Sequence, residues 1–245
     1  MTKSALISGA SRGIGLGIAT RLAQQGYSLT ITARDADRLE AVAAELRAAG
    51  APEVVPVAAD MADEDGVARV LGAHADRFTT MSALILNAGV GTAGTLAESS
   101  MRRFDKTIAV NLRAPIQLIQ GALPLLRAGA AADPDRGAKV VALSSITGVY
   151  AEAGLAVYGA AKAALISLLT TLNAEESANG VTATAIAPGY VDTDMSAWVH
   201  DQVPPHQMLA VNDIVEMTDA LLRLSPRAVV PSIIMSRAGT DGYRA

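Results

Sequence analysis

The chain has 245 residues, of which 51% are hydrophobic and 18% charged, so it can bury a sizeable core and disorder is not expected to dominate. Its net charge of −4 argues against a broad nucleic-acid-binding surface, which needs clustered Lys and Arg. The absence of cysteine excludes disulfides, thiol nucleophiles and thiolate metal sites.

Short apolar runs alternate along the chain with longer segments of helical pattern and length. The expected strands are Ala5–Ser8, Leu29–Ala33, Val54–Ala58, Ala83–Leu86, Val140–Ser144, Thr182–Ala187 and Val229–Met235. The expected helices are Ile14–Gln25, Asp37–Ala49, Asp63–Arg77, Ser100–Leu126, Ala156–Asn179 and Asp213–Leu224. Because the strands are continuous apolar runs, they are typical of a parallel sheet that helices cover on both faces.

These elements predict the fold class α/β, with a single doubly wound parallel sheet of about seven strands in a Rossmann-like arrangement. Residues 128–137 contain two Gly, one Pro and three charged residues, and they predict only a loop. No repeat, low-complexity tract or domain boundary stands out, so residues 1–245 are expected to form one domain. In such folds, ligands bind at the carboxyl ends of the strands.

A glycine-rich turn follows the first strand, where SGASRGIG spans residues 8–15. Gly9, Gly13 and Gly15 let the backbone approach a pyrophosphate, and the free N–H groups at the start of the next helix favour negative charge. A glycine-rich turn that binds nothing is the structural alternative. The position directly after the first strand favours a dinucleotide site.

The end of the second strand indicates which dinucleotide binds. Folds that bind NAD commonly place an acid here for the ribose diol, but this chain has Ala33 and Arg34. Arg34, together with Arg12 from the glycine turn, suits a 2′-phosphate, so NADP(H) is expected in preference to NAD(H). Asp35 and Asp37 leave ribose binding open if the strand ends one residue later, in which case Arg34 is simply solvated.

The sequence YGAAK, residues 158–162, places Tyr158 and Lys162 on one face of a helix, among small residues that let ligands approach. A neighbouring cation favours the phenolate of a tyrosine, which is otherwise a poor acid at neutral pH. Ser145 ends the strand-like KVVALSS, so its hydroxyl can converge with the tyrosine and the lysine. Ser145 would bind the substrate oxygen, Tyr158 would exchange its proton, and Lys162 would hold charge and a cofactor ribose. Taken singly, each of these residues is more often structural.

Four motifs in order make the chain resemble the short-chain dehydrogenase/reductase family over nearly its whole length. They are SGASRGIG, with a serine in place of a frequent threonine, LNAG at residues 86–89, YGAAK, and APGYVDTDM at residues 187–195. The resemblance implies four catalytic residues, with Ser145 preferred over Ser144: Asn111, Ser145, Tyr158 and Lys162. In the family, the asparagine supports a water that links the lysine to solvent; a buried residue that shapes a helix bend is the alternative role for Asn111.

The resemblance also implies a cofactor site along the carboxyl edge of the sheet. Residues 87–89 would lie along the adenosine ribose, Asp60 near the adenine, and residues 188–193 around the nicotinamide. Asp60 could instead cap the helix that begins near Asp63, and Thr193 could be a turn hydroxyl. The expected cofactor-binding residues are Gly9, Ser11, Arg12, Gly13, Ile14, Gly15, Arg34, Asp60, Met61, Asn87, Ala88, Gly89, Tyr158, Lys162, Pro188, Gly189, Val191 and Thr193.

The activity implied by the resemblance is hydride transfer between a nicotinamide and a carbonyl or secondary alcohol, with Tyr158 exchanging a proton with the oxygen. A 3-oxoacyl thioester is one candidate substrate, since the motifs are similar to those of 3-oxoacyl-acyl-carrier-protein reductases. Two alternatives on the same scaffold stay open: a dinucleotide-sensing protein without catalysis, and an epimerase or dehydratase.

The segment of about 190–211 is expected to cover the substrate, as the corresponding segment does in the family. Met195, Trp198 and Met208 would form an apolar lid, or would pack against another subunit. The three histidines of the chain have no acidic or thiol partner at a familiar spacing, so no metal site is expected.

The expected partners follow from the remaining surface and from the start of the chain. The helix over 156–179 is more apolar than one sheet face requires, and the resemblance implies a homotetramer or dimer, with a monomer still open. The polar tail SRAGTDGYRA departs from the family's frequent glycine-pair ending.

A strand-like run starts within MTKSALISGA and leaves no room for a signal peptide, and the uncharged interval 78–97 contains glycines and polar groups unsuited to lipid. A cytoplasmic protein with a small-molecule carbonyl or alcohol substrate, and with no nucleic-acid or membrane partner, is expected.

Overall fold

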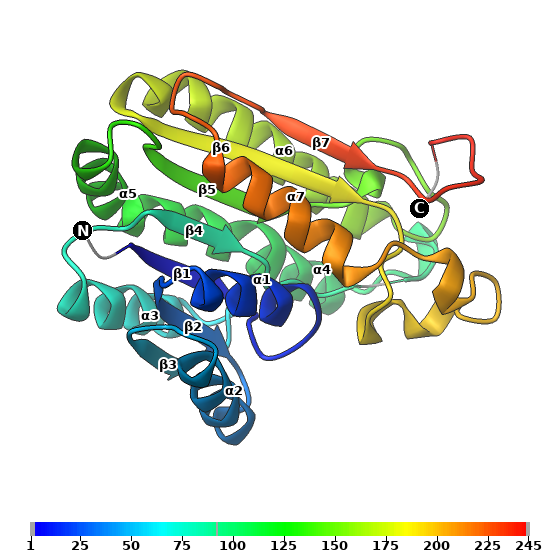
Figure 1. Ribbon diagram of the computed structural model, residues 1–245. Helices are drawn as coiled ribbons and strands as arrows, with labels where there is room; N and C mark the ends of the chain where they lie inside the picture. The colour runs from blue at the N-terminus through cyan, green and yellow to red at the C-terminus, as the bar shows by residue number, and fades with distance from the viewer. Residues whose placement is uncertain (1–2, 92, 244–245) are drawn as a thin grey trace.

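In the computed structural model, which describes residues 3–91 and 93–243, seven parallel strands form one sheet (Figure 1). Their order across the sheet is β3-β2-β1-β4-β5-β6-β7. The strands are β1 Ser4–Ser8, β2 Ser28–Ala33, β3 Val54–Ala58, β4 Ala83–Leu86, β5 Ala138–Leu143, β6 Val181–Pro188 and β7 Ser232–Met235. The predicted α/β class, strand number and parallel pairing are therefore confirmed.

Helices cover both faces of this sheet, as the apolar strands predicted. They are α1 Gly13–Gln24, α2 Ala36–Ala48, α3 Glu64–Arg77, α4 Met101–Ile108, α5 Ala114–Ala132, α6 Ala156–Glu176 and α7 Val211–Arg223. One face packs against α1, α2 and α7, with Ile18 and Leu39 in its core. The other packs against α3, α5 and α6, with Val67 and Leu118 in its core. Two separate hydrophobic cores therefore hold the central strands rigid.

The order of the strands reverses beside β1, because β2 and β3 lie on one side of it and β4 to β7 on the other. In open α/β sheets, a crevice forms outside the carboxyl ends of the strands at such a reversal. β1 ends at Ser8 and pairs there with Leu86 of β4, while Leu143 of β5 pairs with Ile186 of β6. The residues that follow these strands are thus brought to one edge of the sheet.

The helix expected over Ser100–Leu126 is not continuous. α4 and α5 are separated by a π-helical turn, η2, over Ala109–Arg113. Pro115 has no N–H to donate to the carbonyl of Asn111, so a regular α-helix would lose a hydrogen bond at this point. Such π-helical turns frequently occur at functional sites.

Two of the other differences from the predicted boundaries have a clear physical reason. α5 continues to Ala132, into the segment 128–137 that was expected to be a loop, because alanines favour helix; it ends before Pro134. β7 begins at Ser232 and not at Val229, because Pro231 precedes it and cannot donate to a strand ladder.

Candidate active site

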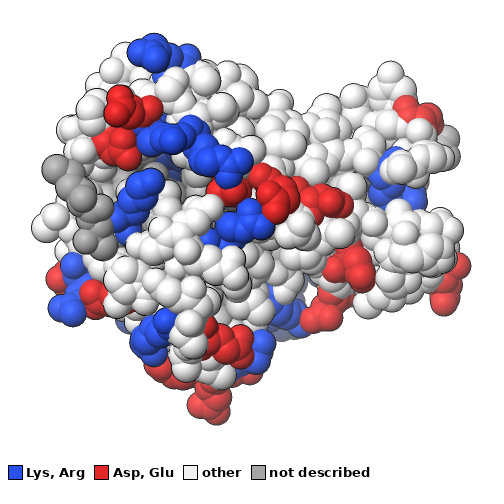
Figure 2. All heavy atoms as spheres, in the orientation of Figure 1, with Lys and Arg blue, Asp and Glu red and all other residues white. Residues whose placement is uncertain are grey.

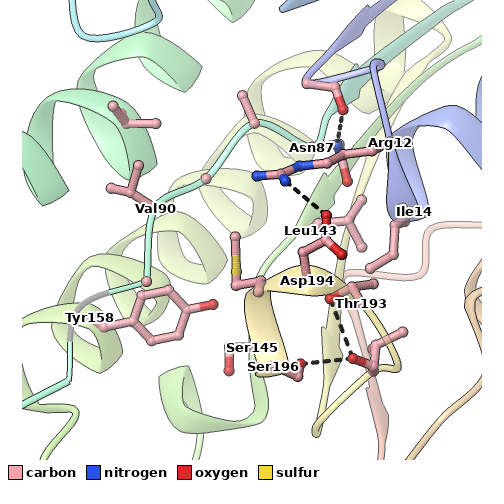
Figure 3. A pocket seen from close by; sticks show the side chains of 18 of the residues that line it. Arg12, Ile14, Asn87, Val90, Leu143, Ser145, Tyr158, Thr193, Asp194 and Ser196 are labelled. Atoms are coloured by element: carbon pink, nitrogen blue, oxygen red, sulfur yellow. Dashed lines mark hydrogen bonds and ion pairs between the residues drawn. The ribbon is translucent and has the colours of Figure 1, made fainter. Parts of the chain in front are cut away.

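A cleft of about 820 Å³ lies at the carboxyl edge of the sheet (Figure 3). Its walls come from the turn after β1, the ends of β2 and β4, the start of α6 and the segment after β6. The predicted cofactor-binding residues line it with the exception of Gly15, and so do the predicted catalytic residues with the exception of Asn111. Gly15 and Asn111 are buried outside this lining. Sequence motifs spread over 185 positions, from Gly9 to Thr193, therefore meet in one place.

The glycine turn needs its glycines for conformation and for space. Gly9 and Gly13 have φ angles of +69° and +55°, which side chains rarely adopt. A Cβ on Gly15 would collide with the Gly9 carbonyl oxygen and with the Asn87 amide. α1 begins at Gly13 without a side-chain cap from Arg12, so its first N–H groups remain available at the cleft. This cradle, which a Cβ would fill, fits a pyrophosphate.

Asn87 holds the glycine turn in place. Its Nδ2 donates to the carbonyl oxygens of Ser8 and Gly9 at 3.1 and 2.8 Å. The Ser8 hydroxyl oxygen accepts from the backbone N–H groups of Asn87 and Ala88, both at 3.1 Å. The Asn87 side chain thus ties the end of β4 to the turn after β1, a role that the motif LNAG alone does not reveal.

The residues considered for the choice between NADP(H) and NAD(H) follow the end of β2. β2 ends at Ala33, and the exposed Arg34 lines the cleft. Asp35 is the N-cap of α2 and accepts the N–H of Arg38 at 3.0 Å, and neither Asp35 nor Asp37 lines the cleft. The later strand end that would have brought an aspartate to the ribose is therefore not observed.

Asp60 and Arg12 also reach the cleft, each with a partner. Asp60 accepts the N–H of Ala62 at 2.9 Å, while the cap of α3 is Asp63, so Asp60 does not cap that helix. Arg12 Nη1 lies 2.8 Å from Asp194 Oδ2, in an ion pair between the glycine turn and the segment after β6 (Figure 3). Both side chains of this pair are 71% exposed.

α6 begins at the cleft and presents Tyr158 and Lys162 from successive turns. Lys162 is buried; its Nζ lies 5.6 Å from the centre of the Tyr158 ring and donates to the carbonyl oxygen of Leu143 at 2.6 Å. Ser144 donates to the Lys162 carbonyl at 2.9 Å and so ties β5 to α6. Ser145, the next residue, accepts the N–H of Thr147 at 3.2 Å, has its hydroxyl oxygen 2.9 Å from that of Thr147, and lines the cleft.

Burial dominates the pKa values of Tyr158 and Lys162. It raises the pKa of Tyr158 to about 12, against the opposing effect of the Ser145 hydroxyl, and lowers the pKa of Lys162 to about 8. The sequence predicted that Lys162 would favour the phenolate, but the ammonium lies over the ring and bonds to Leu143, and desolvation dominates. Tyr158 therefore holds its proton at neutral pH and is ready to act as an acid.

Asn111 lies in the π-helical turn and is 1% exposed. Its Oδ1 accepts the N–H of Val90 and its Nδ2 donates to the Val90 carbonyl, both at 2.9 Å. It thus joins the bend between α4 and α5 to the loop after β4, and its catalytic role stays a prediction. A Cβ on Gly89 would lie 3.4 Å from Asn111 Oδ1 and 3.6 Å from Lys162 Nζ, so these two polar groups border the same small space.

The segment after β6 forms one side of the cleft. Short helices span Asp194–Val199 and Pro205–Gln207, and Val191 pairs with Leu209 as the segment returns. Met195 and Trp198 line the cleft and are 48% and 56% exposed, but Met208 does not line it. Two of the three residues expected in the apolar lid therefore line the cleft.

Several lining residues were not predicted. Tyr190 packs edge-on against Trp198, with ring centres 6.0 Å apart, and donates its hydroxyl to Glu152 Oε1 at 3.0 Å. It lies within residues 188–193, which were expected around the nicotinamide, but it was not itself among the predicted cofactor-binding residues. Lys106 and Val110 enter from α4 and η2, and only their spacing of four residues hinted at a shared face.

None of the three histidines is among the residues that line the cleft. His74 is buried between the hydroxyls of Ser4 and Thr30, and burial lowers its pKa to about 4. Within residues 3–91 and 93–243, no three His, Asp or Glu side chains are grouped so as to hold a metal ion. His74 is therefore a buried core residue with a hydrogen-bond partner for each ring nitrogen.

The fold and the cleft define a dinucleotide-binding α/β protein with a serine, tyrosine and lysine beside the nucleotide cradle. The model of the short chain dehydrogenase family matches residues 3–204, and the chain belongs to this oxidoreductase family. A 3-oxoacyl-acyl-carrier-protein reductase of Staphylococcus aureus is 35% identical over 211 residues, which cover 85% of this chain and 82% of the relative.

Two solved structures resemble the whole chain. An alcohol dehydrogenase from the archaeon Thermococcus sibiricus, complexed with 5-hydroxy-NADP, has a TM-score of 0.86 and 28% identity and covers 100% of this chain and 99% of its own. A 3-ketoacyl-(acyl-carrier-protein) reductase from Brucella melitensis, complexed with NADH, has a TM-score of 0.83 and 25% identity over 96% of each chain. Structures of this fold therefore contain either dinucleotide.

Proposed function

We propose that the protein is an NADP(H)-dependent reductase of ketones, working in the reverse direction on secondary alcohols. The observation that carries the proposal is the convergence of Ser145, Tyr158 and Lys162 on one wall of the cleft that also holds the glycine turn. β5 delivers the serine and α6 the other two, and Ser144 and Lys162 bind these elements together. The arrangement is held by buried hydrogen bonds and is therefore preorganised.

The dinucleotide supplies the hydride when it is bound. The glycine turn and the start of α1 would hold its pyrophosphate, and residues 188–193, which line the opposite wall, would hold its nicotinamide. Asp60, Met61 and residues 87–89 would border its adenosine. These contacts rest on the lining of the cleft and on the family pattern.

The preference for NADP(H) rests on Arg34. It lines the cleft directly after β2, whereas Asp35 is engaged in capping α2 and neither Asp35 nor Asp37 lines the cleft. An exposed guanidinium at this place attracts a 2′-phosphate by charge-assisted hydrogen bonds. Arg12 would add a second cation once it leaves Asp194.

In the reduction, Tyr158 would donate its proton to the substrate oxygen while Ser145 donates a hydrogen bond to the same oxygen. Because the pKa of Tyr158 is raised to about 12, its proton is present at neutral pH. Lys162, next to the ring, would stabilise the phenolate that remains. Asn111 and Lys162 border the space at Gly89, through which we expect the proton to be replaced from solvent.

The substrate class is proposed from the lining beside Tyr158. Leu155, Tyr190, Met195 and Trp198 give this part of the cleft an apolar wall, which suits a ketone with an apolar arm. The Staphylococcus aureus relative is named for 3-oxoacyl-acyl-carrier-protein reduction, so a 3-oxoacyl thioester is our first candidate.

The proposal also covers how the protein exists in the cell: as one domain, in the cytoplasm, and as a homo-oligomer, tetramer or dimer. The helical stretch Ala156–Asn179 is long and apolar enough to cross a membrane by composition, but it carries Tyr158 and Lys162 and packs against β6. On the face shown in Figure 2, Lys and Arg alternate with Asp and Glu without a broad basic area, which suits a small-molecule substrate better than nucleic acid.

A panel of ketones and 3-oxoacyl thioesters, followed by NADPH absorbance, tests the function. The proposal expects NADPH to be consumed in proportion to the carbonyl reduced. Tight NADPH binding without turnover on any substrate would instead favour a dinucleotide sensor. Substrate conversion without net NADPH consumption would favour an epimerase or dehydratase, which regenerates its cofactor within each cycle.

A further inference from the structure

The Ser145 hydroxyl is held from one side by a residue that the proposed reaction does not use, Thr147. Ser145 Oγ accepts the backbone N–H of Thr147 at 3.2 Å, and Thr147 Oγ1 lies 2.9 Å from the same oxygen. The two residues are 8% and 7% exposed, and both line the cleft. No water needs to come between them, because the two hydroxyls touch directly.

A serine hydroxyl has one proton to donate and two positions at which it accepts. If Ser145 donated its proton to Thr147, it could only accept from groups in the cleft, and a carbonyl oxygen has no proton to give. If Thr147 donates, its N–H and O–H fill both accepting positions of Ser145. The proton of Ser145 is then left for the cleft, where Tyr158 and the substrate oxygen lie.

We infer, building on the proposed function, that Thr147 is a positioning residue: it donates its hydroxyl proton to Ser145 Oγ and thereby fixes Ser145 as a hydrogen-bond donor to the oxygen being reduced. Thr147 itself does not touch the substrate oxygen. It determines the direction in which the residue that does touch it offers its proton.

The place of Thr147 is set by close backbone packing. Thr147 lies in a short helix, η3, over Ile146–Gly148, which packs on α6. A Cβ on Gly159 would come within 2.8 Å of the Thr147 carbonyl oxygen, and a Cβ on Gly148 would come within 2.7 Å of the Lys162 carbonyl carbon. Thr147 is thus packed directly on the helix that carries Tyr158 and Lys162.

The direction of the pair is also expressed in the pKa of Tyr158. Burial raises this pKa, and a side-chain hydrogen bond with Ser145 opposes the shift. A hydrogen bond lowers the pKa of a tyrosine when it is donated to the phenolate oxygen, and the Ser145 proton is available for this only if Thr147 is the donor in the Ser145–Thr147 pair. The pKa of Tyr158 therefore reports which of the two hydroxyls donates.

The test compares Thr147→Val, which keeps the shape and the N–H but removes the hydroxyl, with Thr147→Ser, which keeps the hydroxyl. For carbonyl reduction by NADPH, we expect Thr147→Val to lower kcat about tenfold, the effect of losing one oriented hydrogen bond, with KM changed less than about threefold. Thr147→Ser should stay within about threefold of the wild type. If Ser145 instead donates to Thr147, the valine frees the serine proton, and an unchanged or raised kcat would overturn the inference.

A second readout separates this inference from the proposed function. Absence of carbonyl turnover in the wild type counts against the proposed function alone. The titration of Tyr158, followed by the 13Cζ signal of labelled tyrosine, requires no turnover. We expect a higher Tyr158 pKa in Thr147→Val than in Thr147→Ser or the wild type, and equal pKa values in all three would refute the role of Thr147. Thr147→Ala, with the same expected direction, serves if the valine variant does not fold.

Discussion

Lys139 offers a prediction whose size follows from the structure. It lies in β5, is 5% exposed, and its Nζ has no hydrogen-bond partner among the described residues. Burial, reinforced by the charge of Arg136 and opposed by Asp133, lowers the pKa of Lys139 from 10.5 to about 8. At about 1.4 kcal/mol per pKa unit, keeping this ammonium buried costs about 3 kcal/mol of folding stability.

Lys139→Met keeps the apolar stem and removes the charge. At pH 7, which is below the pKa of Lys139 in the folded protein, the full cost of burying the ammonium is present. The free energy of unfolding of the variant should therefore be about 2–3 kcal/mol higher than that of the wild type. The unfolded chain binds more protons than the folded one between pH 8 and 10.5, so wild-type stability rises with pH there. The advantage of the methionine should shrink over the same interval.

Urea unfolding at pH 7 and at pH 10, with the exposed Lys106→Met as control, measures both effects. The control should change stability by less than about 0.5 kcal/mol at either pH. The pKa of Lys162 is also lowered to about 8. The stability of the Lys139→Met variant should therefore still rise with pH, but less than that of the wild type. A Lys139→Met protein that is no more stable at pH 7, or whose gain is the same at pH 10, would refute the reasoning.

Three further predictions concern the cofactor cleft. Gly15→Ala should weaken NADPH binding more than tenfold because its Cβ collides with the Gly9 carbonyl and the Asn87 amide, whereas Gly72→Ala, with open space around it, should leave binding unchanged; equal affinities would contradict the packing argument. Arg34→Ala should lower the NADPH-to-NADH preference in kcat/KM about tenfold or more, while Arg38→Ala on α2 should not, and an unaltered ratio in the Arg34 variant would count against the phosphate contact. Asp194→Asn should release Arg12 and tighten NADPH binding at low salt, with little difference in 0.5 M salt, since the pair is exposed; weaker binding at low salt would show that Asp194 supports the bound state.

The sequence was most informative where the chain obeys local rules. Continuous apolar runs predicted the seven strands, and SGASRGIG after the first of them predicted the cradle. Tyr158 and Lys162 could be paired from their helical spacing alone. Ser145 could be added because it closely follows β5 at the edge where ligands bind.

The missing features depend on contacts between distant segments. Arg12 meets Asp194 from 182 positions away, and Asn111 bonds to Val90 across the cleft wall, and no periodicity encodes either. The helix prediction over 100–126 missed the π-helical turn, because Pro115 changes the hydrogen bonding of one turn within a sequence pattern that stays helical. The raised pKa of Tyr158 follows from burial, which a list of neighbouring charges cannot supply.

The central claim is that Tyr158 gives the proton to the oxygen that receives the hydride. Single-turnover reduction of a preferred ketone, followed by NADPH absorbance in the wild type and in Tyr158→Phe, tests it directly, with NADPH affinity measured in both. We predict that the phenylalanine binds NADPH within about threefold of the wild type and transfers hydride at least about 100-fold more slowly. Hydride transfer at the wild-type rate in Tyr158→Phe would contradict the claim.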